Sequence, residues 1–156
     1  MTLSRTTLIL IATLGSIGLL GGAFAFQYVG GMAPCQLCLY QRWPHAAAIL
    51  IGVVALATGW RGLAWLGVLA ALATAAIGIF HVGVEQKWWV GLATCTAGSI
   101  EGISTSDLLN PAADVAAPVR CDQIAWQMLG ISMAGWNVIL SLGLAAVWAA
   151  AARKAS

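Results

Sequence analysis

The sequence predicts an all-α integral membrane protein, a bundle of four transmembrane helices with a long loop between the third and the fourth. Two observations lead to this prediction. Of the 156 residues, 61% are hydrophobic and only 8% are charged, whereas a soluble domain carries about 25% charged residues. Four apolar segments also approach the roughly 20 residues that a helix needs to cross a bilayer. We expect one membrane domain, residues 1–156.

The four spans are expected at about residues 7–29, 44–58, 62–80 and 133–152. The first contains no charged residue. The second is short, so we expect part of "CLYQRW" to extend it, with Pro44 in its first turn or at a kink. Residues 30–43 and 81–132 are the expected loops on one side, and the longer one has room for a short interfacial helix.

The charges differ between the two predicted sides of the membrane. The side of both termini holds four basic residues and no acid: Arg5, Arg61, Arg153 and Lys154. The other side holds three basic residues and all five acids: Arg42, Lys87, Arg120, Glu85, Glu101, Asp107, Asp114 and Asp122. The positive-inside rule then predicts a multi-pass protein of the bacterial inner membrane with cytoplasmic termini and periplasmic cysteines. A cleavable signal peptide ending near "AFA" at residues 23–25 is an alternative for the N-terminus.

Several functional classes lack their signatures. The net charge is only +2 and no basic run is present, which argues against a nucleic-acid partner. The sequence contains no G-x-x-x-x-G-K-[ST], H-E-x-x-H or G-x-S-x-G motif. Nucleotide-binding and common hydrolase functions are therefore not indicated.

All four cysteines fall on the predicted periplasmic side, which is an oxidising compartment. Cys35 and Cys38 form a C-x-x-C before the second span, whereas Cys95 and Cys121 lie in the long loop. Three pairings are possible, and the geometry favours Cys35–Cys38 and Cys95–Cys121. A C-x-x-C constrains little chain but yields exchangeable thiols, and a following helix places its positive dipole end near them. We interpret Cys35 and Cys38 as a redox pair; Cys95–Cys121 taken alone is equally a structural disulfide.

Polar residues gather beside the C-x-x-C. Gln27 ends the first span, Arg42 and His45 enter the second, and His81 leaves the third. Ionisable groups at membrane depth are candidates for function. Oxidation of a dithiol releases two electrons, yet the motifs for haem, iron–sulfur clusters, flavin and nicotinamide are absent. We therefore expect a membrane quinone as acceptor, with a guanidinium and an imidazole to bind its carbonyl.

Four features together resemble the DsbB family: "PCQLCLYQR", "HVGVEQKWW", "WQMLGISMAGWN" and one cysteine in each half of the loop. These proteins are quinone-dependent membrane oxidases that re-form the disulfide of the periplasmic oxidant DsbA. The resemblance covers nearly the whole chain, with Ala134 where we expect the family pattern to have proline.

The resemblance implies roles for six residues. Cys35 and Cys38 would pass electrons to ubiquinone or menaquinone, with Arg42 and His81 at the quinone. Cys95 and Cys121 would form the loop disulfide that meets a DsbA-like partner, and Cys95 is favoured as the residue attacked. His45 receives no role from the resemblance.

The known reduction potentials of DsbA and of structural disulfides constrain how such a relay can work. DsbA lies at about −120 mV, whereas structural disulfides typically lie below about −300 mV. The gap of about 180 mV corresponds to about 8 kcal/mol, so an ordinary structural disulfide could not reoxidise DsbA. We therefore expect the Cys95–Cys121 disulfide to be strained or exposed. Otherwise quinone must remove its electrons through Cys35–Cys38.

Three alternatives remain open from the sequence. The four cysteines could form a four-thiolate zinc site in a membrane metal-binding protein. The chain could be a structural or assembly protein whose loops are held by disulfides. It could also be a DsbB relative dedicated to one substrate.

Overall fold

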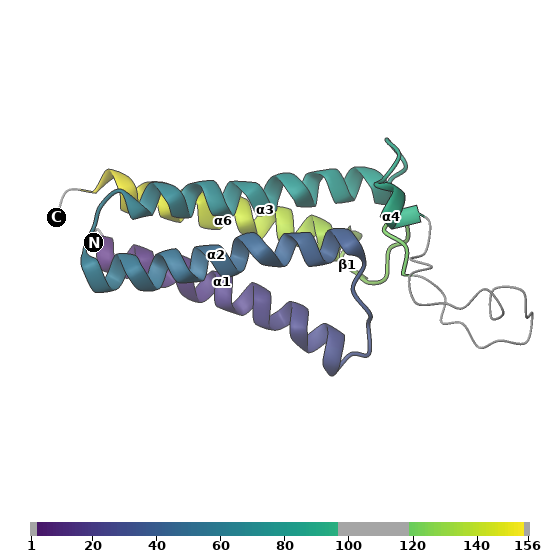
Figure 1. Ribbon diagram of the computed structural model, residues 1–156, viewed down its shortest axis with the longest axis horizontal. Helices are drawn as coiled ribbons and strands as arrows, with labels where there is room; N and C mark the ends of the chain where they lie inside the picture. Colours follow the sequence, from purple (N-terminus) through teal and green to yellow (C-terminus); the bar gives the residue numbers. More distant parts are fainter. Residues whose placement is uncertain (1–2, 97–118, 155–156) are drawn as a thin grey trace, which may run out of the picture.

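The computed structural model, which describes residues 3–96 and 119–154, is a bundle of four long helices (Figure 1). The long helices are α1 (Arg5–Tyr28), α2 (Gln36–Thr58), α3 (Leu63–Glu85) and α6 (Met133–Arg153). A single turn, α4 (Ala93–Thr96), and an antiparallel hairpin of β1 (Gln127–Met128) and β2 (Ile131–Ser132) lie at one end. The predicted all-α bundle is confirmed. Three of the predicted loop acids lie outside the described residues: Glu101, Asp107 and Asp114.

Side-chain caps explain where two of the helices begin. The Ser4 hydroxyl accepts a hydrogen bond from the Thr7 amide at 3.1 Å and caps α1. The Ser132 hydroxyl likewise accepts from the Gly135 amide at 3.2 Å, so α6 begins directly after the hairpin. At its other end α2 stops at Gly59, whose φ of +69° is the left-handed conformation that glycine adopts without strain.

Two helices extend further than the expected span boundaries. α2 begins at Gln36, so Pro44 lies well inside the helix and not in its first turn. α3 continues to Glu85, so His81 belongs to the helix and not to the loop that follows. Both extensions lie at the end of the bundle that carries the cysteines, and they place His81 and Arg42 on ordered helical backbone.

Three of the four long helices have the composition of membrane spans. Within residues 3–96 and 119–154, α1, α3 and α6 are long and apolar enough to cross a membrane. α2 is as long as α3, but Gln41, Arg42 and His45 lower its hydropathy. Large apolar side chains are exposed on the outer faces of all four helices, for example Leu14, Leu50, Leu69 and Leu142. Such a surface suits lipid, where the apolar side chains need no cover.

The interior of the bundle is built mainly from small residues. Its core cluster is rich in alanine and surrounds one large side chain, the fully buried Trp148 of α6. A Cβ atom added to Gly67 of α3 would lie 2.4 Å from the Trp148 ring. Small residues let helix backbones approach closely in a membrane protein, and here Gly67 provides the space for Trp148.

The second half of α1 diverges from this packed interior. All buried residues of α1 lie between Leu8 and Ser16, and beyond them the helix leans away from α2 (Figure 1). A Cβ added to Gly18 or Gly22 would meet nothing within 4 Å. The G-x-x-x-G of α1 therefore does not support close packing within the chain, and the interior is open beside the cysteine-bearing end.

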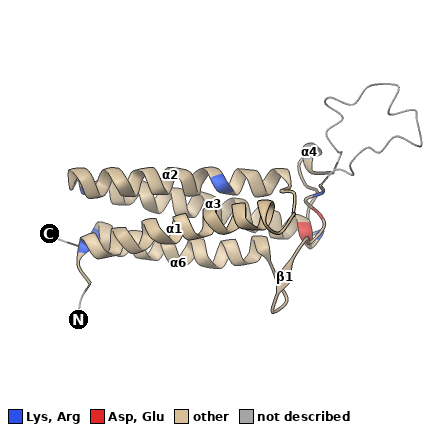
Figure 2. Cartoon of the chain, turned by 90° about the horizontal axis from the view of Figure 1, so that it is seen from below, with Lys and Arg blue, Asp and Glu red and all other residues tan. Residues whose placement is uncertain are grey.

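The charged residues separate toward the two ends of the bundle (Figure 2). At the end with both termini, Arg5 donates to the carbonyls of Gly59 and Trp60 at 3.1 Å each. Arg61 donates to the Lys154 carbonyl at 3.0 Å. The described acids lie near α4 at the opposite end (Figure 2). This separation matches the charge pattern from which we predicted cytoplasmic termini; the orientation itself stays a prediction.

Candidate functional site

Cys35 and Cys38 form a close pair of thiols at the start of α2. Cys35 caps the helix, and its sulfur accepts a hydrogen bond from the Cys38 amide at 3.3 Å. Because the two residues are one helical turn apart, their sulfurs come within 2.8 Å of each other. Cys35 is buried, whereas Cys38 is partly accessible. The structure thus holds the predicted redox pair as a dithiol whose sulfurs already lie side by side.

The second pair, Cys95 and Cys121, is joined by a disulfide, as predicted from the sequence. It lies in the same buried cluster as Cys35, together with Leu37 and Val84. Cys95 is 2% exposed and Cys121 is fully buried. Of the three alternatives expected for this disulfide, namely strain, exposure or removal of its electrons by quinone, exposure is therefore wrong for this state. The disulfide also removes two of the four thiolates that the zinc alternative required.

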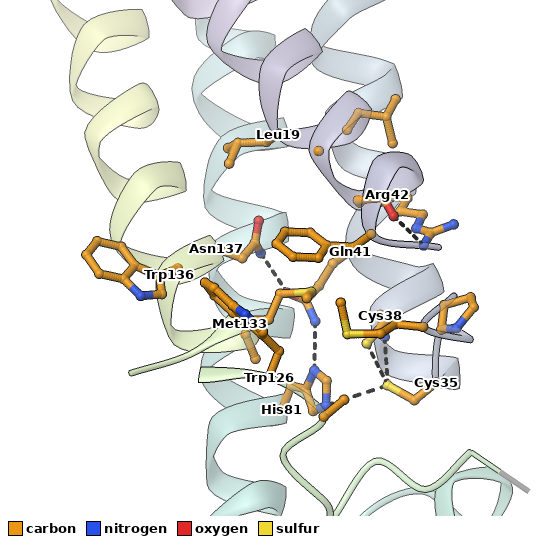
Figure 3. A pocket seen from close by; sticks show the side chains of 18 of the residues that line it. Leu19, Cys35, Cys38, Gln41, Arg42, His81, Trp126, Met133, Trp136 and Asn137 are labelled. Atoms are coloured by element: carbon orange, nitrogen blue, oxygen red, sulfur yellow. Dashed lines mark hydrogen bonds between the residues drawn. The ribbon is translucent and has the colours of Figure 1, made fainter. Parts of the chain in front are cut away.

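His81 of α3 lies directly against the dithiol (Figure 3). Its Nε2 is 3.6 Å from the Cys35 sulfur and 3.8 Å from a carboxylate oxygen of Glu85. Its Nδ1 is 2.9 Å from the amide nitrogen of Gln41. Glu85 in turn accepts a hydrogen bond from the Ser132 hydroxyl at 2.5 Å. His81, a predicted site residue, therefore lies between the Cys35 sulfur and the buried Glu85 carboxylate.

Within the described ranges, Cys35, Cys38 and His81 are the group whose geometry comes nearest to a metal site, with ligand atoms within 4.8 Å of one another. Two thiolates bound to one zinc ion at about 2.3 Å in tetrahedral geometry stand about 3.7 Å apart. The sulfurs of this pair are 2.8 Å apart, which is too close for that arrangement. The geometry favours thiol–disulfide chemistry over metal binding.

Arg42 lies one turn beyond Cys38 and points toward α1. Its guanidinium donates to the Gln27 side-chain oxygen at 2.6 Å and to the Ala23 carbonyl at 3.3 Å. The guanidinium carbon also lies 4.9 Å from the centre of the Phe24 ring. The Nε atom is buried and has no hydrogen-bond partner among the described residues. Two of the five N–H groups of the guanidinium are thus used within the protein, and three have no partner among the described residues.

A cavity of about 470 Å³ opens beside these residues, between the divergent half of α1 and the start of α6. Apolar side chains from both helices line it, among them Leu19, Phe26 and Leu140. Its polar wall comes mainly from α2 and α3 and includes Cys38, Arg42, His81 and His45. Figure 3 shows part of this wall, with Cys38 close to His81 and Arg42 further along α2. The apolar walls and the few convergent polar groups are typical of a small-molecule site.

Three polar residues of this region were not singled out in the sequence: Gln41, Thr74 and Asn137. They connect His81 to His45 through buried hydrogen bonds. The signal that could have revealed them is the occurrence of an amide or hydroxyl inside an otherwise apolar span, where polar side chains need partners. The sequence named His45 without a role, and the structure places its Nε2 3.0 Å from the Asn137 side-chain oxygen.

A helical bundle with a lipid-compatible surface that holds a dithiol and a disulfide in one buried cluster defines a membrane thiol–disulfide oxidoreductase. Residues 5–151 match the family of disulfide bond formation protein DsbB. The chain therefore belongs to the DsbB family of integral membrane disulfide-bond-formation proteins.

Individual relatives agree with this assignment. The chain is 31% identical to disulfide bond formation protein B of Hahella chejuensis, and the match covers 94% of this chain and 93% of the relative. It is 33% identical to the protein of the same name from Methylococcus capsulatus, covering 92% and 91% of the two chains. No solved structure matches the chain significantly.

Proposed function

We propose that this protein reoxidises a DsbA-like periplasmic thiol protein and passes the electrons to a membrane quinone, first through Cys95–Cys121 and then through Cys35–Cys38. One observation carries the proposal. Both cysteine pairs lie in one buried cluster, and Cys38 also lines the apolar cavity beside Arg42. The cluster thus connects a loop disulfide to a space that suits a lipid-soluble acceptor.

The thiol–disulfide steps conserve electrons. A thiolate of the partner attacks the Cys95–Cys121 disulfide, with Cys95 as the favoured target, and releases the other loop cysteine as a thiolate. The released thiolate attacks the Cys35–Cys38 disulfide in the same way. The partner's second thiolate then resolves its mixed disulfide, and the freed loop cysteine re-forms Cys95–Cys121. The net result is one new disulfide in the partner and a reduced Cys35–Cys38 pair.

The residues around the cavity fit a quinone. A quinone, ubiquinone or menaquinone, supplies an acceptor for the two electrons and two protons that the Cys35–Cys38 dithiol gives up. Arg42 would hold a carbonyl oxygen, because it lines the cavity with N–H groups that lack a partner and a charged donor stabilises an oxygen that gains negative charge. We propose His81 as the second polar contact. The apolar walls from α1 and α6 would bind the ring and its substituents.

The buried disulfide requires movement during the reaction. Cys95 and Cys121 are almost inaccessible in this state, so a protein thiolate cannot reach them along the S–S axis. We propose that the segments that carry Cys95 and Cys121 move away from Leu37 and Val84 when the partner binds. The partner would meet them on the periplasmic side of the bacterial inner membrane, opposite the cytoplasmic termini.

The test is a reconstituted reaction of the full chain, quinone and a reduced DsbA-like protein, followed by quinone absorbance and by loss of partner thiols. We expect one quinone reduced for each partner dithiol oxidised. Cys35→Ser and Cys38→Ser should abolish quinone reduction. If either variant still turned over, the proposed order of electron transfer would be wrong.

A matched variant separates the two cysteine pairs. The double substitution Cys95→Ser/Cys121→Ser should lose turnover with the protein substrate but keep it with dithiothreitol, which can reduce Cys35–Cys38 directly. Equal loss with both reductants would show that the loop pair is not an entry point for the partner. A second, unrelated reduced thiol protein in the same assay tests whether the enzyme is dedicated to one substrate.

A further inference from the structure

A chain of polar side chains, buried except for the partly buried Asn137, runs through the bundle from His81 on α3 to His45 on α2. The side-chain nitrogen of Gln41 is 2.9 Å from Nδ1 of His81, and its oxygen accepts from the Asn137 amide at 2.7 Å. The Asn137 oxygen in turn lies 3.0 Å from Nε2 of His45. Figure 3 shows the part of this chain that joins Asn137, Gln41, His81 and Cys35. The oxygen and nitrogen of each side-chain amide, in Gln41 and in Asn137, could exchange places by a flip of the amide group. The orientation of these amides decides which ring nitrogens of His81 and His45 carry protons.

Thr74 fixes the direction at Asn137. The Thr74 hydroxyl donates its single proton to the backbone carbonyl of Gln41 at 3.1 Å, and a carbonyl can only accept. The Thr74 oxygen is therefore an acceptor for Asn137, which lies 3.1 Å away. Only the NH₂ group of Asn137 can face it. The same NH₂ group donates its other proton to the Gln41 side-chain oxygen.

A second backbone group fixes Gln41 independently. The side-chain nitrogen of Gln41 lies 3.2 Å from the carbonyl of Leu37, one turn earlier on α2. Because that carbonyl only accepts, the NH₂ group of Gln41 must face it, and its second proton points to Nδ1 of His81. Both anchors give the same orientation, although they act on different residues of the chain.

The proton position on His81 follows. Nδ1 accepts from Gln41, so the neutral ring carries its proton on Nε2. Nε2 lies 3.6 Å from the Cys35 sulfur and 3.8 Å from a Glu85 carboxylate oxygen, and the backbone of Cys121 is also within hydrogen-bonding reach of the ring. Two N–H groups thus converge on the Cys35 sulfur, that of His81 and the Cys38 backbone amide at 3.3 Å.

We infer that Gln41, Asn137 and Thr74 are positioning residues that hold His81 as the Nε2–H tautomer, so that the ring donates a hydrogen bond to the Cys35 sulfur and does not take a proton from it. The inference rests on the proposed function in that Cys35 takes part in thiol–disulfide exchange. A thiolate is the reactive form of cysteine, and a donated hydrogen bond stabilises it whenever Cys35 attacks or leaves. His81 then acts as a fixed donor whose single Nε2–H serves the Cys35 sulfur in this state and a quinone carbonyl when one is bound, and the protein interior sets its tautomer.

Nitrogen NMR of the histidine rings tests this inference directly. The chain contains only two histidines, and the network predicts Nε2–H for both, because His45 donates to the Asn137 oxygen. In the full chain labelled with ¹⁵N-histidine, both rings should show a protonated Nε2 and an unprotonated Nδ1. Only the His81 Nε2–H resonance should shift when Cys35–Cys38 changes between dithiol and disulfide. A ring protonated on Nδ1, or two resonances that ignore the oxidation state, would overturn the inference.

A matched pair of variants tests the role of the amide. Gln41→Glu replaces the donor to Nδ1 by an acceptor and should move the His81 proton to Nδ1, with loss of the oxidation-dependent shift. Gln127→Glu makes the same change on the exposed hairpin and should leave both rings unaltered. Unchanged spectra in Gln41→Glu would also contradict the inference. Because the wild-type spectra need neither quinone nor partner, failure of the inference is distinguishable from failure of the proposed function.

Discussion

Replacing Arg42 by alanine removes the one guanidinium that lines the cavity from α2. Two of its nitrogens already donate to α1, at Gln27 and Ala23, and the face of the group lies over the Phe24 ring. These contacts hold the side chain at the cavity wall. Three N–H groups, that of the buried Nε and one on each terminal nitrogen, are left without a partner among the described residues, and under the proposed function one of them binds a quinone carbonyl.

The size of the effect follows from that single bond. A hydrogen bond from a charged donor contributes about 1.5–3 kcal/mol, so its loss should raise the KM for quinone about 10- to 150-fold. Arg42→Lys should give a smaller rise, because it retains the charge but not the planar group with its several N–H donors. The exchange between Cys95–Cys121 and the partner does not involve Arg42 and should proceed normally.

The assay measures initial rates of quinone reduction over a range of quinone concentrations with reduced partner in excess. Partner oxidation by the pre-oxidised enzyme without quinone serves as an internal reference for the cysteine steps. Arg61→Ala is the matched control, because it removes the same charge at the opposite end of the bundle, where Arg61 donates to the Lys154 carbonyl. An unchanged KM in Arg42→Ala would refute the assignment of Arg42 to the quinone.

Two further predictions concern glycines with opposite surroundings. Gly22→Leu should raise the KM for quinone without lowering the melting temperature, because Gly22 lines the cavity and its Cβ position is free of neighbours within 4 Å. Gly21→Leu, which is equally free but does not line the cavity, is the control, and equal KM values would contradict the location of the site. Gly67→Ala should cost about 1–3 kcal/mol of stability by overpacking against Trp148. In thermal unfolding it should melt below Gly143→Ala, whose added methyl meets nothing; similar melting temperatures would show that the ring relaxes freely.

The sequence was sufficient for those features that depend on composition and short spacing. Long apolar runs predicted the helical bundle, and the interval of two residues in the C-x-x-C predicted a sulfur pair at a helix start. The pairing of Cys95 with Cys121 also followed, since Cys35 and Cys38 are held together by their own helical turn. In each case the signal lies within one segment of the sequence or in the small number of ways in which four cysteines can pair.

The features that the sequence could not provide depend on how helices face one another. Gln41, Thr74 and Asn137 come from three helices, and nothing local shows that their side chains meet. The burial of Cys95–Cys121 depends on the packing of the loop against Leu37 and Val84, which no periodicity reports. The cavity likewise exists because α1 stops packing after Ser16, although its second half is as apolar in sequence as its first.

The buried loop disulfide also constrains how electrons can leave the partner. If Cys95–Cys121 had the potential of an ordinary structural disulfide, accepting electrons from a DsbA-like protein would be unfavourable by about 8 kcal/mol, or about a millionfold in equilibrium constant. Solvent exposure cannot account for a higher potential here, because both cysteines are buried. Under the proposed function, rapid removal of the electrons can compensate, provided that the next acceptor is in contact. Cys35 packs in the same cluster, and Cys38 lines the cavity. Once the loop segments return to Leu37 and Val84, each transfer therefore has its acceptor adjacent and the loop pair need not accumulate as a dithiol.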